Sequence, residues 1–201
     1  MLVLGFESAD HELDAWISRA LELCADHGGT PKKKSGESDA SADWKQAFLR
    51  MPYFRNYLTP LGLIADTFET AITWDRFEEF YDGVKDKVGN AIVKSCGHPA
   101  LVSCRFTHVY PDGPAPYFTF YAVGTNNGDM ASALSRWQDI KAAANEAVVS
   151  LGGTCTHHHA VGRDHRSAYE AETSPLIRQA FRDVKQRFDP KGVLNPGVVL
   201  V

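Results

Sequence analysis

The chain has 201 residues, of which 44% are hydrophobic and 23% are charged, and its net charge is −4. This length and balance fit one globular domain with a sizeable core. They argue against a nucleic-acid surface, because the only basic run, Lys32-Lys33-Lys34, is followed by acidic residues and reads as a solvated loop. No apolar run approaches the ~20 residues of a membrane-spanning helix, so no transmembrane segment is expected.

The cysteine pattern indicates reduced thiols and a cytoplasmic protein. No two cysteines form a CxxC pair, and no Cys/His spacing matches a zinc finger. The four cysteines are Cys24, Cys96, Cys104 and Cys155.

The first quarter of the chain predicts one strand and two helices. Residues 2–7 have the apolar character of a core strand that begins at once, so we expect the chain to be the C-terminal piece of a longer polypeptide or to be cut at a domain boundary. Asp10 can cap a helix over 11–27, whose apolar residues recur at helical spacing. A short amphipathic helix around Phe48 is expected to end before Pro52.

The middle of the chain predicts a sheet and a long helix. Residues 62–70 have the β-branched and aromatic bias of a strand. Residues 74–95 carry an apolar stripe at helical spacing. A turn at 110–114 then separates two strands, 101–108 and 117–123, and this pattern is typical of a hairpin.

The last third predicts helices over 130–150 and 174–187 and an irregular tail over 188–197. Because a hairpin excludes a purely parallel sheet, we expect an α+β fold. Its mainly antiparallel, ferredoxin-like sheet should carry helices on one face.

A histidine-rich loop lies between the two last predicted helices. His157, His158 and His159 follow Gly152-Gly153, and glycines let a loop approach a ligand closely. If the loop is extended, His157 and His159 point to one side and His158 to the other. Neutral imidazoles can transfer protons near pH 7 or donate to an oxyanion. A metal site would need ligands from elsewhere, and a histidine-rich surface loop is the third reading; we assign no metal.

Four other residues are candidates for chemistry. Arg55 lies in an aromatic-rich segment, where packing could hold its guanidinium as an anion clamp, or it is an exposed helix-end residue. Tyr117 begins a strand and could act as a general acid or base, or it could simply pack at the edge of the core. Asp66 and Glu69 lie among apolar strand residues; either of them, if buried, would need a partner, and an exposed strand face is an equal alternative.

Taken together, these segments resemble the C-terminal part of the alkyldihydroxyacetonephosphate synthase family, which belongs to the FAD-linked oxidase and vanillyl-alcohol-oxidase superfamily. The triple histidine is the most specific feature. Relatives that act on 2-hydroxy acids usually carry an acidic residue beside a histidine there, and an earlier metal motif; neither is present. The segments that carry the resemblance are residues 52–56, 66–76, 103–108, 117–120, 152–159, 161–162 and 188–195.

The resemblance implies that residues 1–201 form a substrate-binding, or cap, domain, and that FAD is bound mainly by an N-terminal domain absent from this chain. The family exchanges the acyl group of acyl-dihydroxyacetone phosphate for a long-chain alcohol, an ether-lipid reaction. A small-molecule or lipid substrate, contact with a membrane surface and a homodimer are further expectations. FAD-dependent oxidation of an alcohol or 2-hydroxy acid, and a ligand- or metal-binding module without catalysis, are the alternatives.

The resemblance also assigns roles to individual residues. Tyr117 matches the proton-transfer tyrosine of the family, and residues 157–159 match the histidine loop that assists it. Arg55 matches an arginine that meets the substrate phosphate or the flavin, although Asn56 replaces its usual acidic neighbour. Asn195, in the tail, is the expected cofactor contact.

Overall fold

The computed structural model of the chain describes residues 2, 4, 6–30, 40–125 and 127–200, with the backbone alone for 40–45. The basic run at 32–34 lies outside these residues. The chain divides into two compact units, Met1–Arg55 and Asn56–Val201, and each is described by itself.

The first unit holds helix α1, Asp14–Asp26, and most of helix α2, Ala40–Leu58. Helix α1 confirms the helix predicted over 11–27. The strand predicted over 2–7 is wrong: none of its described residues is in a strand, and Leu2 is 68% exposed. A strand needs a neighbour to satisfy its backbone groups, and all strands of the described residues lie in the second unit.

The predicted end of the second helix before Pro52 is also wrong. Helix α2 continues through Pro52 to Leu58 and passes into a 3-10 turn, Thr59–Leu61, which ends at Gly62 with φ of 76°. Proline removes one backbone N–H and its hydrogen bond, but the other bonds of a 19-residue helix remain. The aromatic segment around Arg55 is therefore helical.

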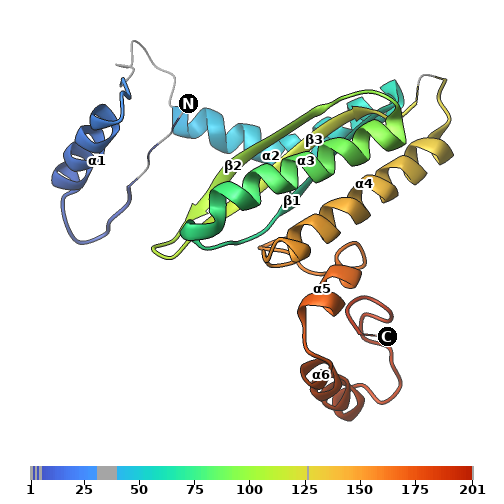
Figure 1. The fold of residues 1–201 in the computed structure, drawn as a ribbon. Coiled ribbons are helices and arrows are strands. Elements are labelled where there is room, and N and C mark those ends of the chain that lie inside the picture. The colour runs from blue at the N-terminus through green and yellow to red at the C-terminus, as the bar shows by residue number, and fades with distance from the viewer. Residues whose placement is uncertain (1, 3, 5, 31–39, 126, 201) are drawn as a thin grey trace. The chain divides into compact units, whose positions relative to one another are not determined.

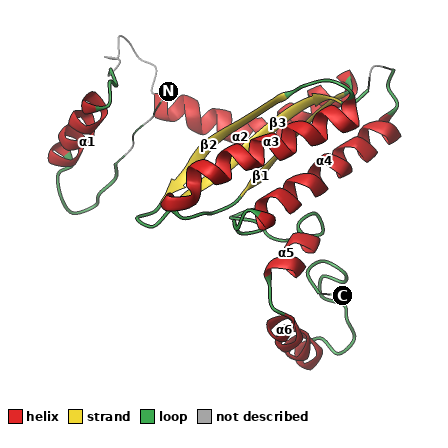
Figure 2. Ribbon diagram, viewed as in Figure 1, coloured by secondary structure: helices red, strands yellow, loops and turns green. Residues whose placement is uncertain are grey.

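An antiparallel sheet forms the centre of the second unit, and Figures 1 and 2 show its long strands. Its strands are β1, Leu63–Glu69, β2, Leu101–Val109, and β3, Pro114–Val123. In the described residues the order is β1-β3-β2. Strands β2 and β3 form the predicted hairpin, and its turn is closed by the Tyr110 N–H, which donates to the Gly113 carbonyl at 3.0 Å.

Helices α3, Phe77–Cys96, and α4, Met130–Ser150, cover one face of this sheet (Figure 1). Burial alternates along β3, and every second side chain packs under the helices. This arrangement confirms the predicted α+β fold, with the strand–helix–strand–strand–helix order of a ferredoxin-like sheet. The largest core side chains are Phe68, Phe80, Phe118, Phe120, Ile92 and Ile140.

The opposite face of the sheet brings together residues from all three strands. Tyr117 pairs with Glu69 on one side and with Arg105 on the other, so these side chains share that face. A register shift between Phe106 and His108 adds one residue to β2. Such a bulge reverses the alternation beyond it. His108 therefore points to the same face as Tyr117, whereas Phe106 packs against the aromatic rings of Trp74 and Phe77.

Two further helices complete the second unit, α5, Arg166–Glu172, and α6, Pro175–Phe188. Helix α5 was not predicted, because seven residues are too few for a periodic apolar pattern. Helix α6 confirms the helix predicted over 174–187, and the Ser174 side chain caps its first turn. The tail is irregular, as predicted. The Asp189 carboxylate accepts hydrogen bonds from the backbone N–H groups of Val193 and Leu194 in this tail.

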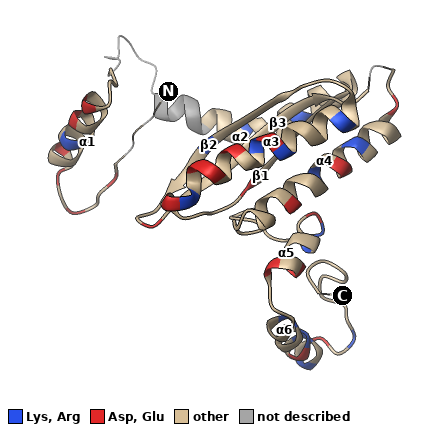
Figure 3. Cartoon of the chain, in the orientation of Figure 1, with Lys and Arg blue, Asp and Glu red and all other residues tan. Residues whose placement is uncertain are grey.

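Charges on the helices are mixed in sign, as Figure 3 shows for α3 and α4. Helix α3 begins with Glu78 and Glu79 and has Lys94 in its last turn, which complements the helix dipole. Within the described part of the chain, no helix combines the length and apolar character needed to cross a membrane.

Candidate functional site

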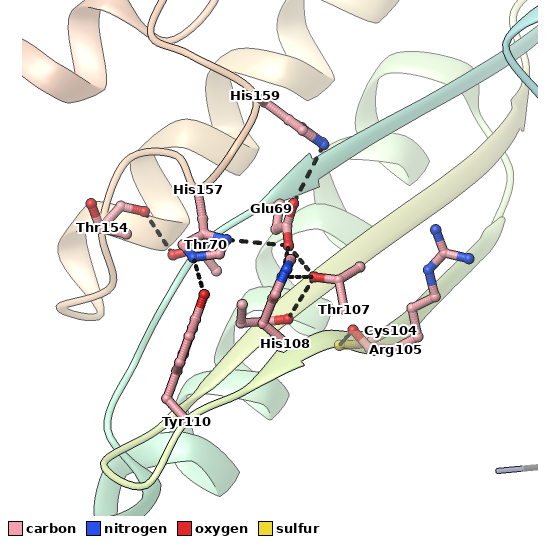
Figure 4. A network of polar contacts seen from close by, with 11 residues as sticks. Glu69, Thr70, Cys104, Arg105, Thr107, His108, Tyr110, Thr154, His157 and His159 are labelled. Carbon is pink, nitrogen blue, oxygen red and sulfur yellow. Dashed lines mark hydrogen bonds and ion pairs between the residues drawn. The ribbon is translucent and has the colours of Figure 1, made fainter. Parts of the chain in front are cut away.

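A buried carboxylate lies at the centre of the candidate site. Glu69, the last residue of β1, is 3% exposed. Its Oε1 accepts a hydrogen bond from the Thr107 hydroxyl and lies 3.3 Å from His157 Nδ1, while its Oε2 lies 3.5 Å from His159 Nε2 (Figure 4). A buried carboxylate requires such partners. The contacts of Glu69 therefore hold His157 and His159 in position.

The end of helix α4 aims the histidine loop at Glu69. The N–H of Gly152 donates to the Val149 carbonyl at 3.0 Å, and that of Gly153 to Val148 at 2.9 Å. This pair of bonds is a Schellman ending, with Gly152 in the left-handed region at φ of 84°. Gly153 has no room for a side chain, because an added Cβ would lie 2.7 Å from the buried Phe80 ring.

Backbone bonds then hold the loop beside the end of β1. The Thr154 N–H donates to the Ala71 carbonyl at 3.2 Å, and the His157 N–H donates to the Glu69 carbonyl at 3.0 Å. The Thr70 hydroxyl donates to the Thr154 carbonyl at 2.6 Å. The loop therefore follows β1 closely before it reaches the second and third histidines.

The backbone of the loop is not extended at His158. His158 has φ of 59°, as does Ala160, a conformation that costs a non-glycine residue of order 1–3 kcal/mol. The expected division of side chains still holds, since His157 and His159 both face Glu69 and His158 does not. Instead, the His158 ring stacks on His108, with centroids 4.5 Å apart and planes at 8°.

Three residues that the sequence did not single out belong to this cluster: Thr107, His108 and Tyr110. The bulge places His108 Nδ1 3.7 Å from Glu69 Oε1. The Tyr110 hydroxyl lies 3.3 Å from His157 Nε2. Their only sequence signal was the pair of polar residues, Thr107 and His108, at the end of a predicted strand. The sequence could not show which face each side chain occupies, because that depends on the bulge.

Tyr117 lies at the edge of the same cluster and is half-buried. Its hydroxyl donates to the Thr67 hydroxyl at 3.1 Å. The Arg105 guanidinium lies 4.5 Å from the centre of its ring. The His159 ring meets the Tyr117 ring edge-on, with centroids 5.3 Å apart and planes at 87°. The structure thus brings Tyr117 and residues 157–159 together, while their catalytic roles stay predictions.

Two predicted site residues lie elsewhere in the chain. Arg55 is in the last turn of α2, in the first compact unit, and its side chain is exposed. Asn195 is an exposed residue of the C-terminal tail with φ of 43°. Among the described residues, no hydrogen bond joins Asn195 to the histidine loop; its carbonyl accepts from the Val198 N–H. Their roles in binding substrate and cofactor remain predictions.

Burial changes the acid–base properties of several groups. It lowers the pKa of His159, and the nearby Lys141 ammonium acts in the same direction, whereas the Glu69 carboxylate opposes both. Burial also raises the pKa of the Cys104 and Cys155 thiols to about 12. Because the thiolate is the reactive form, these two cysteines are poor nucleophiles.

A cleft of about 580 Å³ is lined in part by His159. Lys141, on α4, is buried in its wall, where its Nζ donates to the Thr67 carbonyl at 2.8 Å and lies 3.1 Å from Asp66 Oδ2. The Trp137 indole also donates to this carboxylate oxygen, at 2.7 Å. Asp66 therefore binds side chains of α4 and has a structural role, whereas Glu69 contacts the histidine loop.

We expect Asp66→Asn to lower the free energy of unfolding by about 3–5 kcal/mol, since it leaves the buried Lys141 ammonium without its counter-charge. Denaturant unfolding measures this change. The double variant Asp66→Asn with Lys141→Met should recover most of the loss, because both charges are then absent. A double variant that is as unstable as Asp66→Asn alone would contradict the ion-pair explanation.

Comparison with known proteins shows the family of the chain. The family model of FAD linked oxidases, C-terminal domain, matches residues 1–199. The chain belongs to this family. It is 28% identical over 189 residues to alkyldihydroxyacetonephosphate synthase of Caenorhabditis elegans, and this match covers 94% of the chain and 30% of that protein. The synthase of Trypanosoma brucei brucei is 25% identical over 201 residues, covering 100% of the chain and 31% of that protein.

Solved structures give the same fold. A structure of alkyldihydroxyacetonephosphate synthase matches 92% of this chain and 28% of its own, with a TM-score of 0.59 and 17% sequence identity. The chain spans about 30% of the length of the curated relatives named here. The predicted family and fold are therefore confirmed.

Proposed function

We propose that this chain forms the substrate side of an FAD-dependent active site, and that the whole enzyme exchanges the acyl group of acyl-dihydroxyacetone phosphate for a long-chain alcohol. The observation that carries the proposal is the position of Tyr117 against His159, within a cluster ordered by the buried Glu69. A phenol beside an oriented imidazole is suited to proton transfer. The family and the similarity to the synthases support the choice of reaction.

The open face of the sheet fits a planar aromatic group such as the flavin ring. It carries the half-buried Tyr117 next to the exposed Arg105, and Leu101, which is 61% exposed. Flat apolar surface with a few placed polar groups is what cofactor sites present. Arg105 and Tyr117 would contact the ring from this side, and Asn195 is the proposed contact from the tail. Bound FAD would supply an electrophilic centre for the substrate carbon.

Tyr117 is the proposed proton-transfer residue of this site. Its hydroxyl donates to Thr67, a hydroxyl that can accept and donate in turn. We propose that Tyr117 acts as the phenolate, which takes a proton from the substrate carbon that bears the acyl group and later returns it to that carbon, so the exchange needs no net oxidant. The fatty acid leaves with the ester oxygen and takes up the hydroxyl proton of the alcohol, whose oxygen replaces it on the same carbon.

The histidines would serve this exchange by position and polarity. Glu69 holds His157 and His159 by their ring nitrogens, so the imidazoles need no reordering when charge develops on the leaving carboxylate. His158, in the same loop, would line the site. Arg55 is the proposed clamp for the substrate phosphate, because a guanidinium binds phosphate oxygens in pairs.

The function is tested with the full-length protein purified with its cofactor. The purified protein should be yellow. When it is given acyl-dihydroxyacetone phosphate and a labelled long-chain alcohol, it should release fatty acid and form the labelled ether in equal amounts. Mass spectrometry measures both products. Colourless protein that binds no FAD would refute the proposal. Flavin bleaching by an alcohol or a 2-hydroxy acid under anaerobic conditions, without ether formation, would assign oxidation instead.

A further inference from the structure

We propose that His108, His157 and His158 form a binding site for a divalent transition metal such as Zn²⁺. One nitrogen from each ring lies within 4.8 Å of the other two. Two of these histidines come from the loop after α4, and the third is brought to them by the bulge in β2. This set differs from our expectation of no metal, and it takes one of its three ligands from outside the histidine loop.

The spacing requires only a small closure of the cluster. In a tetrahedral site with Zn–N bonds of about 2.0–2.1 Å, ligand nitrogens are separated by about 3.4 Å, so the rings must approach by no more than about 1.5 Å. His158 is exposed and the His108 side chain is 42% exposed, so both can rotate about their side-chain bonds. Their rings are stacked, with centroids 4.5 Å apart and planes at 8°, so this rotation must break the stacking to aim both in-plane lone pairs at one ion.

Glu69 supplies the outer-shell carboxylate that metal-binding histidines usually have. Metal ligands of this type commonly direct the second ring nitrogen to a carboxylate, which fixes the ring and its tautomer. Here the Nδ1 atoms of His157 and His108 lie 3.3 and 3.7 Å from Glu69 Oε1. This orientation leaves both Nε2 atoms for an ion. The Tyr110 hydroxyl, 3.3 Å from His157 Nε2, would move aside or contact a metal-bound ligand.

The ligand set selects a class of ion. Three imidazoles suit Zn²⁺, Cu²⁺ or Ni²⁺ better than Mg²⁺ or Ca²⁺, which prefer oxygen. The exposed His158 and the partly exposed His108 side chain give an ion a route from solvent. Three protein ligands leave a fourth position for water or an anionic oxygen. The site depends on these side chains alone and does not require the proposed flavin reaction.

The test is calorimetric titration of the chelator-treated full-length protein with ZnCl₂, followed by CoCl₂ titration monitored in the visible spectrum. We expect one Zn²⁺ per chain and the intense visible bands of tetrahedral Co²⁺. His108→Ala and His158→Ala should each abolish stoichiometric binding. Glu69→Gln, which keeps all three ligands, should weaken the affinity about 10–100-fold. His159→Ala and the control His27→Ala should retain binding.

The variants separate this site from its alternatives. Loss of binding in His159→Ala with retention in His108→Ala would overturn the proposal, because the ion would then be bound without His108. Equal losses in His27→Ala and His108→Ala would show surface binding only and would also overturn it. Circular dichroism of His108→Ala checks that its loss of Zn²⁺ binding is not caused by unfolding. His158→Ala removes a second ligand and tests the loss of Zn²⁺ binding independently.

Discussion

Tyr117→Phe in the full-length enzyme is expected to lower kcat by about 10²–10⁴-fold, the usual contribution of a positioned acid or base. Phenylalanine keeps the ring under Arg105 and beside His159. Only the hydroxyl and its bond to Thr67 are lost, so the free energy of unfolding should fall by about 0.5–1.5 kcal/mol at most. Steady-state kinetics and flavin absorbance measure the two effects separately.

Tyr121→Phe is the matched control for this variant. Tyr121 lies on the same strand and the same face, four residues further on, and pairs with Ala65 and Leu101 rather than with Glu69. It should keep the parent kcat. Parent-like turnover by Tyr117→Phe would remove the tyrosine from the mechanism, and equal losses in both variants would indicate a general effect on the sheet face.

Glu69→Gln is expected to have the second largest effect, through the histidines and not through direct contact with substrate. An amide keeps the volume but replaces one acceptor oxygen with a donor, which faces groups that donate. The free energy of unfolding should fall by about 1–3 kcal/mol. Misplacement of His157 and His159 should lower kcat about 10²-fold and leave KM nearly unchanged.

Glu172→Gln tests whether this effect is specific to the carboxylate under the histidines. Glu172 also holds the loop, by accepting from the Cys155 N–H at 2.7 Å and from the Thr154 hydroxyl at 2.8 Å. Its carboxylate contacts no histidine in these bonds, and glutamine can still accept both donors in part. We expect a kcat close to the parent value. If Glu69→Gln changes unfolding but not kcat, Glu69 has a structural role only.

Local pattern was enough for most elements of this fold. Helices α3 and α4 were predictable because a long apolar stripe at 3.6-residue spacing is specific to a helix. The hairpin was predictable because a proline- and glycine-rich turn separates two aromatic strands. The strand expected over 2–7 shows the limit of this reasoning, since an apolar run becomes a strand only where another strand can pair with it.

The candidate site shows a second limit. The sequence identified the histidine loop by composition and Tyr117 by its place on a strand, and it left Glu69 open between a buried and an exposed role. Burial of that carboxylate depends on the loop after α4 returning to the end of β1, a contact across 88 residues of sequence. No local pattern encodes a contact at that separation.

The amino-acid sequence by itself therefore determined the antiparallel α+β class, the family and the loop of three histidines. Only the tertiary structure decided that Glu69 lies beneath that loop, and that His108 faces the same side as Tyr117. The reason is the same in both cases. Propensity and periodicity are set by near neighbours, whereas burial and the direction of a side chain after a β-bulge are set by the strands and loops that pack against it.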